Sequence, residues 1–278
     1  MSEVVSVPGG TIAYETAGAG PMVVLAHGMG DSRAAYRFVA PRLAAAGYLV
    51  VAVDLRGCGE SSARWPSYSR TDIAGDLLAV VRHVDRGPAV LVGHSIAGGA
   101  ATVAAAQDPG LVKGVVELCP FTRAQSVRLG DFRSKRYRTG ALRLLGASLF
   151  GSASLWSRYL DHAYPGSRPA DWTERLARVE AMLGEPGRMG ALRKMALSAP
   201  ADAGAQLGSV RCPALIVEGS IDPDWVDPRA EGEAIVAAMP TGVGELAAIE
   251  GAGHYPHDQY PEETVSLIRA FLDAHARA

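Results

Sequence analysis

Short apolar runs rich in β-branched residues alternate with longer alanine-rich stretches along most of the chain. This alternation restricts the fold more than any other feature, because repeated strand–helix–strand units form a mostly parallel sheet covered by helices on both faces. An opening hairpin is expected at Val4–Val7 and Thr11–Thr16. The later strands are expected at Met22–Ala26, Tyr48–Asp54, Ala89–Val92, Val112–Leu118, Ala214–Glu218 and Glu245–Ile249. The core helices are expected at Arg33–Ala46, Thr71–Val84, Ala97–Ala106, Arg229–Met239 and Glu262–Ala274. The pattern predicts an α/β fold with a mostly parallel, doubly wound sheet.

The alternation stops between Phe121 and about Gly208, where no strand is predicted. An insertion that leaves the carboxyl end of a parallel strand emerges on the side where such sheets bind ligands. We therefore expect a core formed by residues 1–120 and 209–278, and a helical cap formed by residues 121–208 over the site. The cap helices are expected at Gly140–Phe150, Ala153–Leu160, Asp171–Leu183 and Arg188–Leu197.

Composition excludes several classes of protein. The 278 residues are 48% hydrophobic and 20% charged, so a large core can form. A net charge of −2 lacks the basic excess that a general nucleic-acid binder shows. Cys58, Cys119 and Cys212 are too few and too scattered for a disulfide framework or a zinc site, and we expect reduced thiols. With no signal peptide pattern and no apolar run of membrane-spanning length, we expect a cytoplasmic protein with no membrane partner.

The most specific motif is Gly93-His94-Ser95-Ile96-Ala97-Gly98. It follows an apolar strand and precedes a helix, which is the context that a nucleophile elbow requires. In such a sharp turn the Ser95 hydroxyl is held clear of the backbone. The fifth position is Ala97, where the commonest pattern has glycine, and Gly98 follows at once.

Two further loops follow predicted strands. His27-Gly28-Met29-Gly30 comes after Met22–Ala26, and we interpret His27 as a structural residue that holds the loop. Asp54-Leu55-Arg56-Gly57-Cys58-Gly59 comes after the next strand, and Asp54 with Arg56 is expected to hold that loop through charge-assisted hydrogen bonds. Cys58 is expected to be a small buried side chain.

These three motifs, in this order, resemble the α/β-hydrolase superfamily, and in particular its cap-bearing serine hydrolases with esterase-like activity. The resemblance covers nearly the whole chain and is weakest in the cap. It implies an oxyanion hole formed by the backbone N–H groups of Met29 and Ile96, and a catalytic triad in the chain order Ser–Asp–His. Serine at the elbow separates this chain from the haloalkane dehalogenases and epoxide hydrolases of the superfamily, which carry aspartate there.

The acid of the triad is expected just beyond the strand that ends at Gly219. Asp222 matches the position that the resemblance implies. Asp224 and Asp227 are rivals that we interpret as loop or N-cap residues. Glu117 is a weaker rival, because it lies inside a predicted strand and not after it.

The base is expected after the last strand, within Gly251-Ala252-Gly253-His254. His254 matches the implied position, and His257 is the second choice. Together, Ser95, Asp222 and His254 predict a serine hydrolase that cleaves a carboxylic ester or related acyl bond of a small, largely apolar substrate through an acyl-enzyme intermediate, with no metal or organic cofactor.

The predicted partner is a small-molecule acyl substrate, and the oligomeric state stays open. Two alternatives remain: a non-hydrolytic ligand receptor of the same fold, or a hydrolase acting on C–C, lactone or thioester bonds.

Trp156 and Trp172 are expected to contribute to an apolar substrate pocket in the cap. The start of the cap carries a basic run that either steers an anionic substrate or forms a solvated helix face: Arg123, Arg128, Arg133, Lys135, Arg136, Arg138 and Arg143.

Overall fold

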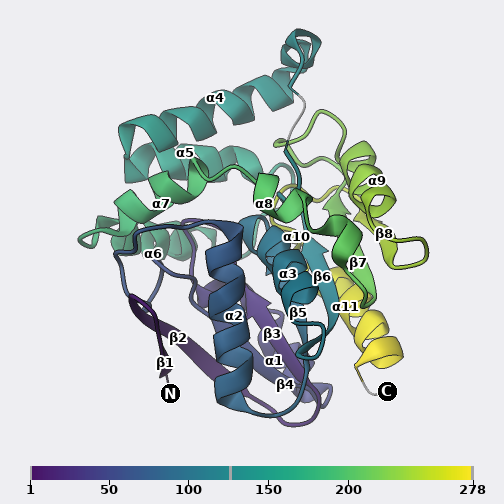
Figure 1. Ribbon diagram of the computed structural model, residues 1–278. Helices are drawn as coiled ribbons and strands as arrows, with labels where there is room; N and C mark the ends of the chain where they lie inside the picture. The colour runs from purple at the N-terminus through teal and green to yellow at the C-terminus, as the bar shows by residue number, and fades with distance from the viewer. Residues whose placement is uncertain (1, 125–126, 277–278) are drawn as a thin grey trace.

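A computed structural model describes residues 2–124 and 127–276, and it contains one eight-stranded sheet between two layers of helices (Figure 1). The strand order is β1-β2-β4-β3-β5-β6-β7-β8. Only β1 with β2 and β2 with β4 pair antiparallel, and all other neighbours are parallel. The predicted fold class is confirmed. The strands are β1 (Glu3–Val7), β2 (Gly10–Ala17), β3 (Met22–Ala26), β4 (Leu49–Val53), β5 (Ala89–His94), β6 (Val112–Leu118), β7 (Ala214–Gly219) and β8 (Gly244–Ile249).

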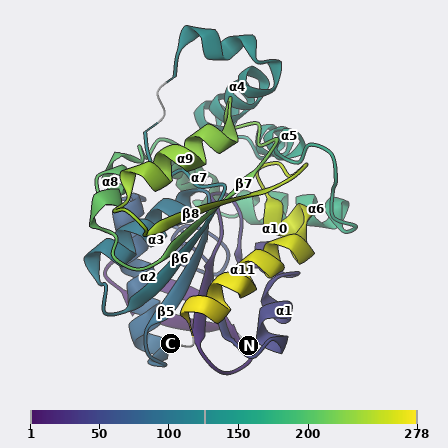
Figure 2. The same ribbon diagram turned by 90° about the vertical axis from the view of Figure 1, so that its right-hand side faces the viewer.

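Helices cover both faces of the sheet (Figure 2). One face packs against α2 (Arg70–Val84), α3 (Ile96–Gln107) and α9 (Pro228–Ala238), and the other against α1 (Ala40–Ala45) and α11 (Pro261–His275). Along β5, Leu91 enters the first of these two cores, whereas Val90 and Val92 enter the second. Because successive side chains point to opposite faces, a strand buried on both faces is apolar along its whole length.

The helix predicted at Arg33–Ala46 is wrong in its extent. The structure has a short 3₁₀ helix, η1 (Arg33–Tyr36), followed separately by α1. Pro41 occupies the first turn of α1. A continuous helix would lose the hydrogen bond that the missing proline N–H cannot donate, and the ring would clash with the preceding turn. Gly47 follows the end of α1 with a φ of +89°, a backbone conformation that favours glycine.

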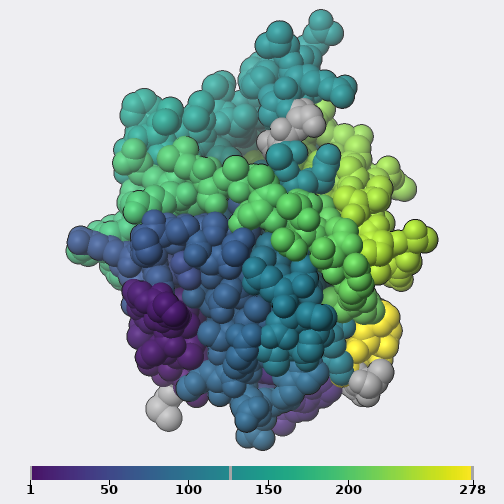
Figure 3. Space-filling model, in the orientation of Figure 1, coloured from purple at the N-terminus to yellow at the C-terminus, as the bar shows by residue number. Residues whose placement is uncertain are grey.

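The segment between β6 and β7 is helical among its described residues, as predicted. Its four longer helices lie at the end of the molecule opposite the two termini (Figure 1). Figure 3 shows the later part of this segment lying directly against the core. Its helices are η2 (Leu129–Arg133), α4 (Lys135–Phe150), α5 (Ala153–Ala163), α6 (Trp172–Gly184), α7 (Arg188–Ala196), α8 (Ala201–Gly204) and η3 (Leu207–Ser209).

The longer helices of this inserted segment share a small apolar core of their own, which includes Trp156, Tyr159 and Val179. The last two helices pack back on the main core, where Ala203 and Leu207 join the cluster of α2 and α3. A short helix that the sequence did not predict, α10 (Pro256–Gln259), follows the last strand. None of the helices in the described part of the chain is long and apolar enough to cross a membrane.

Candidate active site

Ser95 lies in the sharp turn between β5 and α3. Its backbone has φ of +56° and ψ of −118°, a conformation that residues other than glycine rarely adopt. Such backbone strain costs about 1–3 kcal/mol and persists where the surrounding structure enforces it. Here the enforcement is visible in the hydrogen bonds, because Ser95 donates its N–H to Leu118 O and accepts one from Phe121 N.

The close approach of strand and helix depends on Gly93. A Cβ atom at this position would lie 2.2 Å from the carbonyl oxygen of Ala97, so only glycine fits. The methyl group of Ala97 is itself fully buried in the core that includes α2 and α3. The departure from glycine at the fifth motif position is therefore accommodated by ordinary packing.

The loop after β3 lies next to Ser95, at the cavity that Ser95 and Ile96 border. His27 accepts a hydrogen bond from Leu55 N at its Nε2 (3.0 Å), which fits the structural role predicted for it. Met29 borders one cavity together with Ser95 and Ile96. As the first residue of α3, Ile96 has an N–H group with no acceptor inside the helix.

The loop after β4 is held by charge, but not by the predicted pair. Asp54 accepts hydrogen bonds from Arg33 N (2.7 Å) and Glu60 N (2.9 Å), and its carboxylate pairs with the Arg33 guanidinium. Arg56 instead donates two hydrogen bonds to Asp76, of 2.7 and 2.8 Å. Both residues do hold this region through charge-assisted hydrogen bonds, each with a partner on another element.

His254 and Asp222 meet at the carboxyl ends of β7 and β8. The Nδ1 atom of His254 lies 2.7 Å from Asp222 Oδ2, and both side chains are buried. Gly219 makes this approach possible, because a Cβ there would lie 2.1 Å from Gly253 O. The residue before Ser95, His94, places its Nε2 atom 2.7 Å from His254 O. The elbow and the two loops therefore converge on one site.

Asp224 lies beside this pair and is not simply a loop residue. Its Oδ2 atom is 3.5 Å from His254 Nδ1 and accepts a 2.5 Å hydrogen bond from Tyr159 Oη. Its backbone N–H donates to Asp222 Oδ1 (2.9 Å). The tyrosine belongs to α5, so the inserted segment touches the acid side of the site directly.

The remaining alternatives for the acid, Asp227 and Glu117, and for the base, His257, all lie in structural positions. Asp227 caps α9, where its Oδ1 accepts a hydrogen bond from Ala230 N (3.0 Å). Glu117 is buried inside β6 and accepts hydrogen bonds from the hydroxyl groups of Thr102 and Thr122. His257 is buried, and burial lowers its pKa to about 4.

Electrostatics make His254 an unusually basic imidazole. Burial lowers its pKa, but the carboxylates of Asp222 and Asp224 outweigh that effect and raise the pKa to about 9. Burial, together with the negative charge of Asp222, raises the pKa of the Asp224 carboxyl to about 6. With this pKa the imidazole is mostly protonated below about pH 9, and the neutral form that can accept a proton becomes more populated as the pH rises.

Cys119 completes a cluster of potential metal ligands with Asp222 and His254, whose ligand atoms lie within 4.8 Å of one another. The thiol is fully buried, and burial together with the nearby Asp222 charge raises its pKa well above the usual range. A thiol that keeps its proton is a poor metal ligand, and the imidazole Nδ1 is already hydrogen-bonded to Asp222. The donor set therefore fits a proton relay better than a metal site.

A cavity of about 290 Å³ opens beside Ser95. Apolar side chains form much of its wall, including Leu144 from α4 and Met195 from α7. Trp156 and Trp172 are not among the described residues that line it. Trp156 is buried between Tyr159 and the rest of the segment's own core, and Trp172 packs on Tyr164. The structure therefore does not place either ring in the wall of this cavity, because packing between helices of the inserted segment uses both of them.

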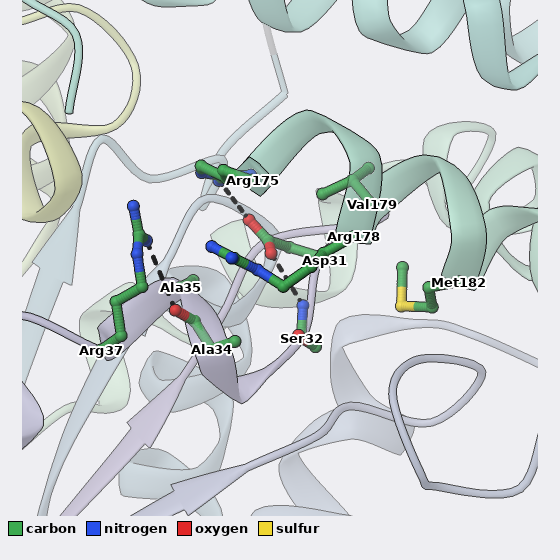
Figure 4. Close-up of a pocket in the computed structure, with 9 residues that line it drawn as sticks. All are labelled: Asp31, Ser32, Ala34, Ala35, Arg37, Arg175, Arg178, Val179 and Met182. Atoms are coloured by element: carbon green, nitrogen blue, oxygen red, sulfur yellow. Dashed lines mark hydrogen bonds and ion pairs between the residues drawn. The ribbon is translucent and has the colours of Figure 1, made fainter. Parts of the chain in front are cut away.

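A smaller pocket of about 30 Å³ lies where α6 meets the loop after β3 (Figure 4). There Arg175 donates 2.6 Å hydrogen bonds to Asp31 and to Asp258, and all three side chains are buried. None of the predicted catalytic residues lines this pocket. We interpret it as the contact through which α6 is held on the core.

Sequence reasoning missed the contact that Tyr159 and Asp224 make, because it joins residues 65 positions apart in the chain. It also missed Arg70, which lines the cavity from the first turn of α2. Neither Tyr159 nor Arg70 belongs to a local motif, so the sequence carried no signal for their place in the site. The basic run is mainly exposed, although Arg123 pairs with Glu231 (2.9 Å).

Comparison with known proteins identifies the family and the fold of this chain. A model of the alpha/beta hydrolase family matches residues 23–267. The chain is 28% identical to the 2-(acetamidomethylene)succinate hydrolase of Mesorhizobium japonicum, over 95% of this chain and 92% of that protein. It is 31% identical to the pimeloyl-[acyl-carrier protein] methyl ester esterase of Chromobacterium violaceum, over 94% of this chain and 98% of that protein. The structure of an esterase from Exiguobacterium antarcticum superposes with a TM-score of 0.83 at 19% identity, covering 98% of this chain and 100% of that one.

Proposed function

Because the chain belongs to the alpha/beta hydrolase family, we propose that it is a serine hydrolase that cleaves a carboxylic ester, or a related acyl bond, of a small and largely apolar substrate. The observation that carries the proposal is the strained backbone of Ser95 at the wall of the cavity. The buried pair of His254 and Asp222 at 2.7 Å supports it. One similar protein is named an esterase and another a hydrolase, which agrees with this class of reaction.

In the proposed reaction, Ser95 Oγ attacks the carbonyl carbon of the ester while His254 Nε2 takes the hydroxyl proton. The N–H groups of Met29 and Ile96 hold the oxygen on which negative charge develops. The bond to the alcohol then breaks, and His254 returns its proton to the departing oxygen. Asp222 accepts the Nδ1 hydrogen bond throughout, which fixes the tautomer and stabilises the charged imidazole.

A water molecule completes the cycle. It adds to the acyl carbon as His254 takes its proton, the bond between the acyl group and Ser95 breaks, and the proton returns to Ser95 Oγ. The products are the carboxylic acid and the alcohol. We further propose that residues 121–208 act as a cap that supplies part of the cavity wall and limits access of water to the site.

The test combines active-site labelling with turnover. A fluorophosphonate probe should label the wild-type chain, and mass spectrometry should place the label on Ser95. Ser95→Ala should lose the label and at least about 10⁴-fold in kcat on the best of a series of p-nitrophenyl esters of graded chain length. Ser198→Ala removes a hydroxyl group from another residue lining the cavity, and it should keep both the label on Ser95 and the wild-type kcat.

Two results would contradict the proposal. Retained ester hydrolysis in Ser95→Ala would remove the serine nucleophile from the mechanism. Rapid labelling of Ser95 without turnover of any ester would favour a ligand receptor that keeps the triad. Turnover restricted to lactones or thioesters would keep the nucleophile and change the substrate class.

A further inference from the structure

The cavity beside Ser95 contains one charged side chain. Among the described residues that line it, only Arg70 carries a charge, and the rest are mainly apolar or small. The Arg70 side chain comes from the first turn of α2, and the residue is 4% exposed. A cation in such surroundings has lost most of its hydration, which is costly unless other groups replace the water.

The hydrogen bonds of Arg70 hold its position without neutralising its charge. Its Nε donates to Phe121 O (2.7 Å) and its Nη1 donates to Ser198 O (2.9 Å). A guanidinium has five N–H groups, so three of them have no acceptor among the described residues. Asp202 is close enough to influence Arg70, yet its carboxylate accepts hydrogen bonds from Thr71 N and Oγ1 (both 3.0 Å) and forms no ion pair with Arg70.

Other buried arginines of this chain are neutralised. Arg56 pairs with Asp76, and Arg175 pairs with both Asp31 and Asp258. Arg70 therefore stands apart as a buried guanidinium that no described carboxylate neutralises. Burial lowers its pKa to about 10, so the side chain stays charged at neutral pH.

The arginine is also connected to the reaction centre. Phe121 donates its N–H to Ser95 O (3.1 Å), and its carbonyl accepts the hydrogen bond from Arg70 Nε. One residue thus separates the guanidinium from the backbone of the proposed nucleophile. The close passage of the side chain along α3 depends on Gly99, where a Cβ would lie 2.9 Å from Arg70 Cδ.

We propose that Arg70 is an anchor for a carboxylate group of the substrate, so that the preferred substrate is an ester with a second, free carboxylate separated from the ester group by an apolar spacer. The inference rests on the proposed function, whose site it extends. A carboxylate matches the fork of N–H groups that a guanidinium presents and replaces the hydration lost on burial. The apolar walls, such as Leu144 and Met195, fit a chain of methylene groups between the two ends.

The test compares matched esters. Mono-p-nitrophenyl adipate carries the free carboxylate, and p-nitrophenyl hexanoate is a neutral ester of the same chain length. We expect wild-type kcat/KM to favour the adipate ester, and Arg70→Met to lower kcat/KM for that ester by about 10- to 100-fold, mainly through KM. The hexanoate ester should change by less than about threefold. Arg70→Lys should keep part of the preference, because it keeps the charge but loses the fork.

A matched control is Arg188→Met. Arg188 is also buried and donates a hydrogen bond to a backbone carbonyl, that of Ser61, but it does not line the cavity. This variant should keep the preference for the adipate ester even if its melting temperature falls. Should Arg70→Met fail to fold, the wild-type protein still provides a readout: the monoamide of adipic acid, which keeps one carboxylate, should slow fluorophosphonate labelling of Ser95 at a lower concentration than neutral hexanamide.

The outcomes separate the two proposals. Equal kcat/KM for the two esters in the wild type, or equal losses on both in a folded Arg70→Met, would overturn the anchor and leave the serine hydrolase intact. Absence of labelling and of turnover with either ester would overturn the proposed function itself. Protection of Ser95 by the monoamide of adipic acid that persists unchanged in Arg70→Lys and in folded Arg70→Met would also refute the anchor.

Discussion

Two neighbouring aspartates provide the sharpest test of the proposed chemistry, because they differ in distance and not in type. Asp222 Oδ2 lies 2.7 Å from His254 Nδ1, whereas Asp224 Oδ2 lies 3.5 Å from the same atom and accepts the Tyr159 hydroxyl. Asp222→Asn and Asp224→Asn are nearly isosteric substitutions. We expect the first to remove the hydrogen bond that holds the imidazole and the second to remove only a nearby charge.

The expected magnitudes follow from these contacts. Asp222→Asn should lower kcat by about 10⁴-fold, because the amide favours the wrong tautomer of the imidazole. This corresponds to about 5.4 kcal/mol of lost transition-state stabilisation. Asp224→Asn should lower kcat by less than about tenfold at the pH optimum, because the hydrogen bond from Nδ1 to Asp222 stays in place.

The two variants also differ in pH dependence. The negative charges of Asp222 and Asp224 raise the pKa of His254, and the imidazole must be neutral to act as the base. Removing the charge of Asp224 destabilises the imidazolium form, so the pKa of His254 falls. An opposite charge at this range changes a pKa by about 1–3. The acidic limb of kcat/KM should therefore move to lower pH by about that amount.

The assay is the initial rate of ester hydrolysis between about pH 5 and pH 10, followed by pH-stat titration so that the colour change of a reporter phenol plays no part. Asp227→Asn is the control, since this residue belongs to the same loop but caps α9. It should leave the acidic limb where it is in the wild type. A loss in Asp224→Asn as large as in Asp222→Asn, or an acidic limb that does not move, would refute the assignment of roles to the two carboxylates.

Three further predictions concern stability and the elbow. Arg175→Met should lower the free energy of unfolding by about 3–5 kcal/mol in urea titrations, because buried Asp31 would lose its ion-pair partner and Asp258 would keep only Arg37, and an unchanged midpoint would contradict this. Burial raises the pKa of Glu218 well above its usual range, so folding retains a proton that the unfolded chain releases, and stability should fall with rising pH above the ordinary glutamate pKa by up to about 1.4 kcal/mol per pH unit. Glu218→Gln should flatten that slope in unfolding curves measured from pH 5 to pH 8, and an equally steep slope would speak against a protonated Glu218. Gly93→Ala should reduce both the melting temperature and fluorophosphonate labelling, since its Cβ would lie 2.2 Å from a backbone oxygen of α3, and a variant with wild-type labelling would show that the turn can relax.

The sequence by itself determined the features that local chemistry specifies. Alternation of apolar strands and helices is a short-range pattern, and it predicted the sheet and the inserted helices. The glycines around Ser95 and before His254 signal tight turns within a few residues, so the candidate positions could be found from the chain alone. Even the error at Arg33–Ala46 had a local cause, in Pro41, that a stricter reading of helix breakers would have found.

Only the tertiary structure decided which distant side chains meet around those turns. Arg70 enters the cavity because α2 packs beside α3, and Tyr159 reaches Asp224 because α5 contacts the loop that follows β7. Trp156 was expected in the pocket but packs in the apolar cluster of the inserted helices. An apolar ring is equally stable in a pocket wall or in such a cluster, so the sequence cannot distinguish the two positions. The sequence also could not predict which charged side chains form ion pairs. Asp54 pairs with Arg33 and not with Arg56. Many oppositely charged residues are available in the chain, and only the folded backbone selects among them.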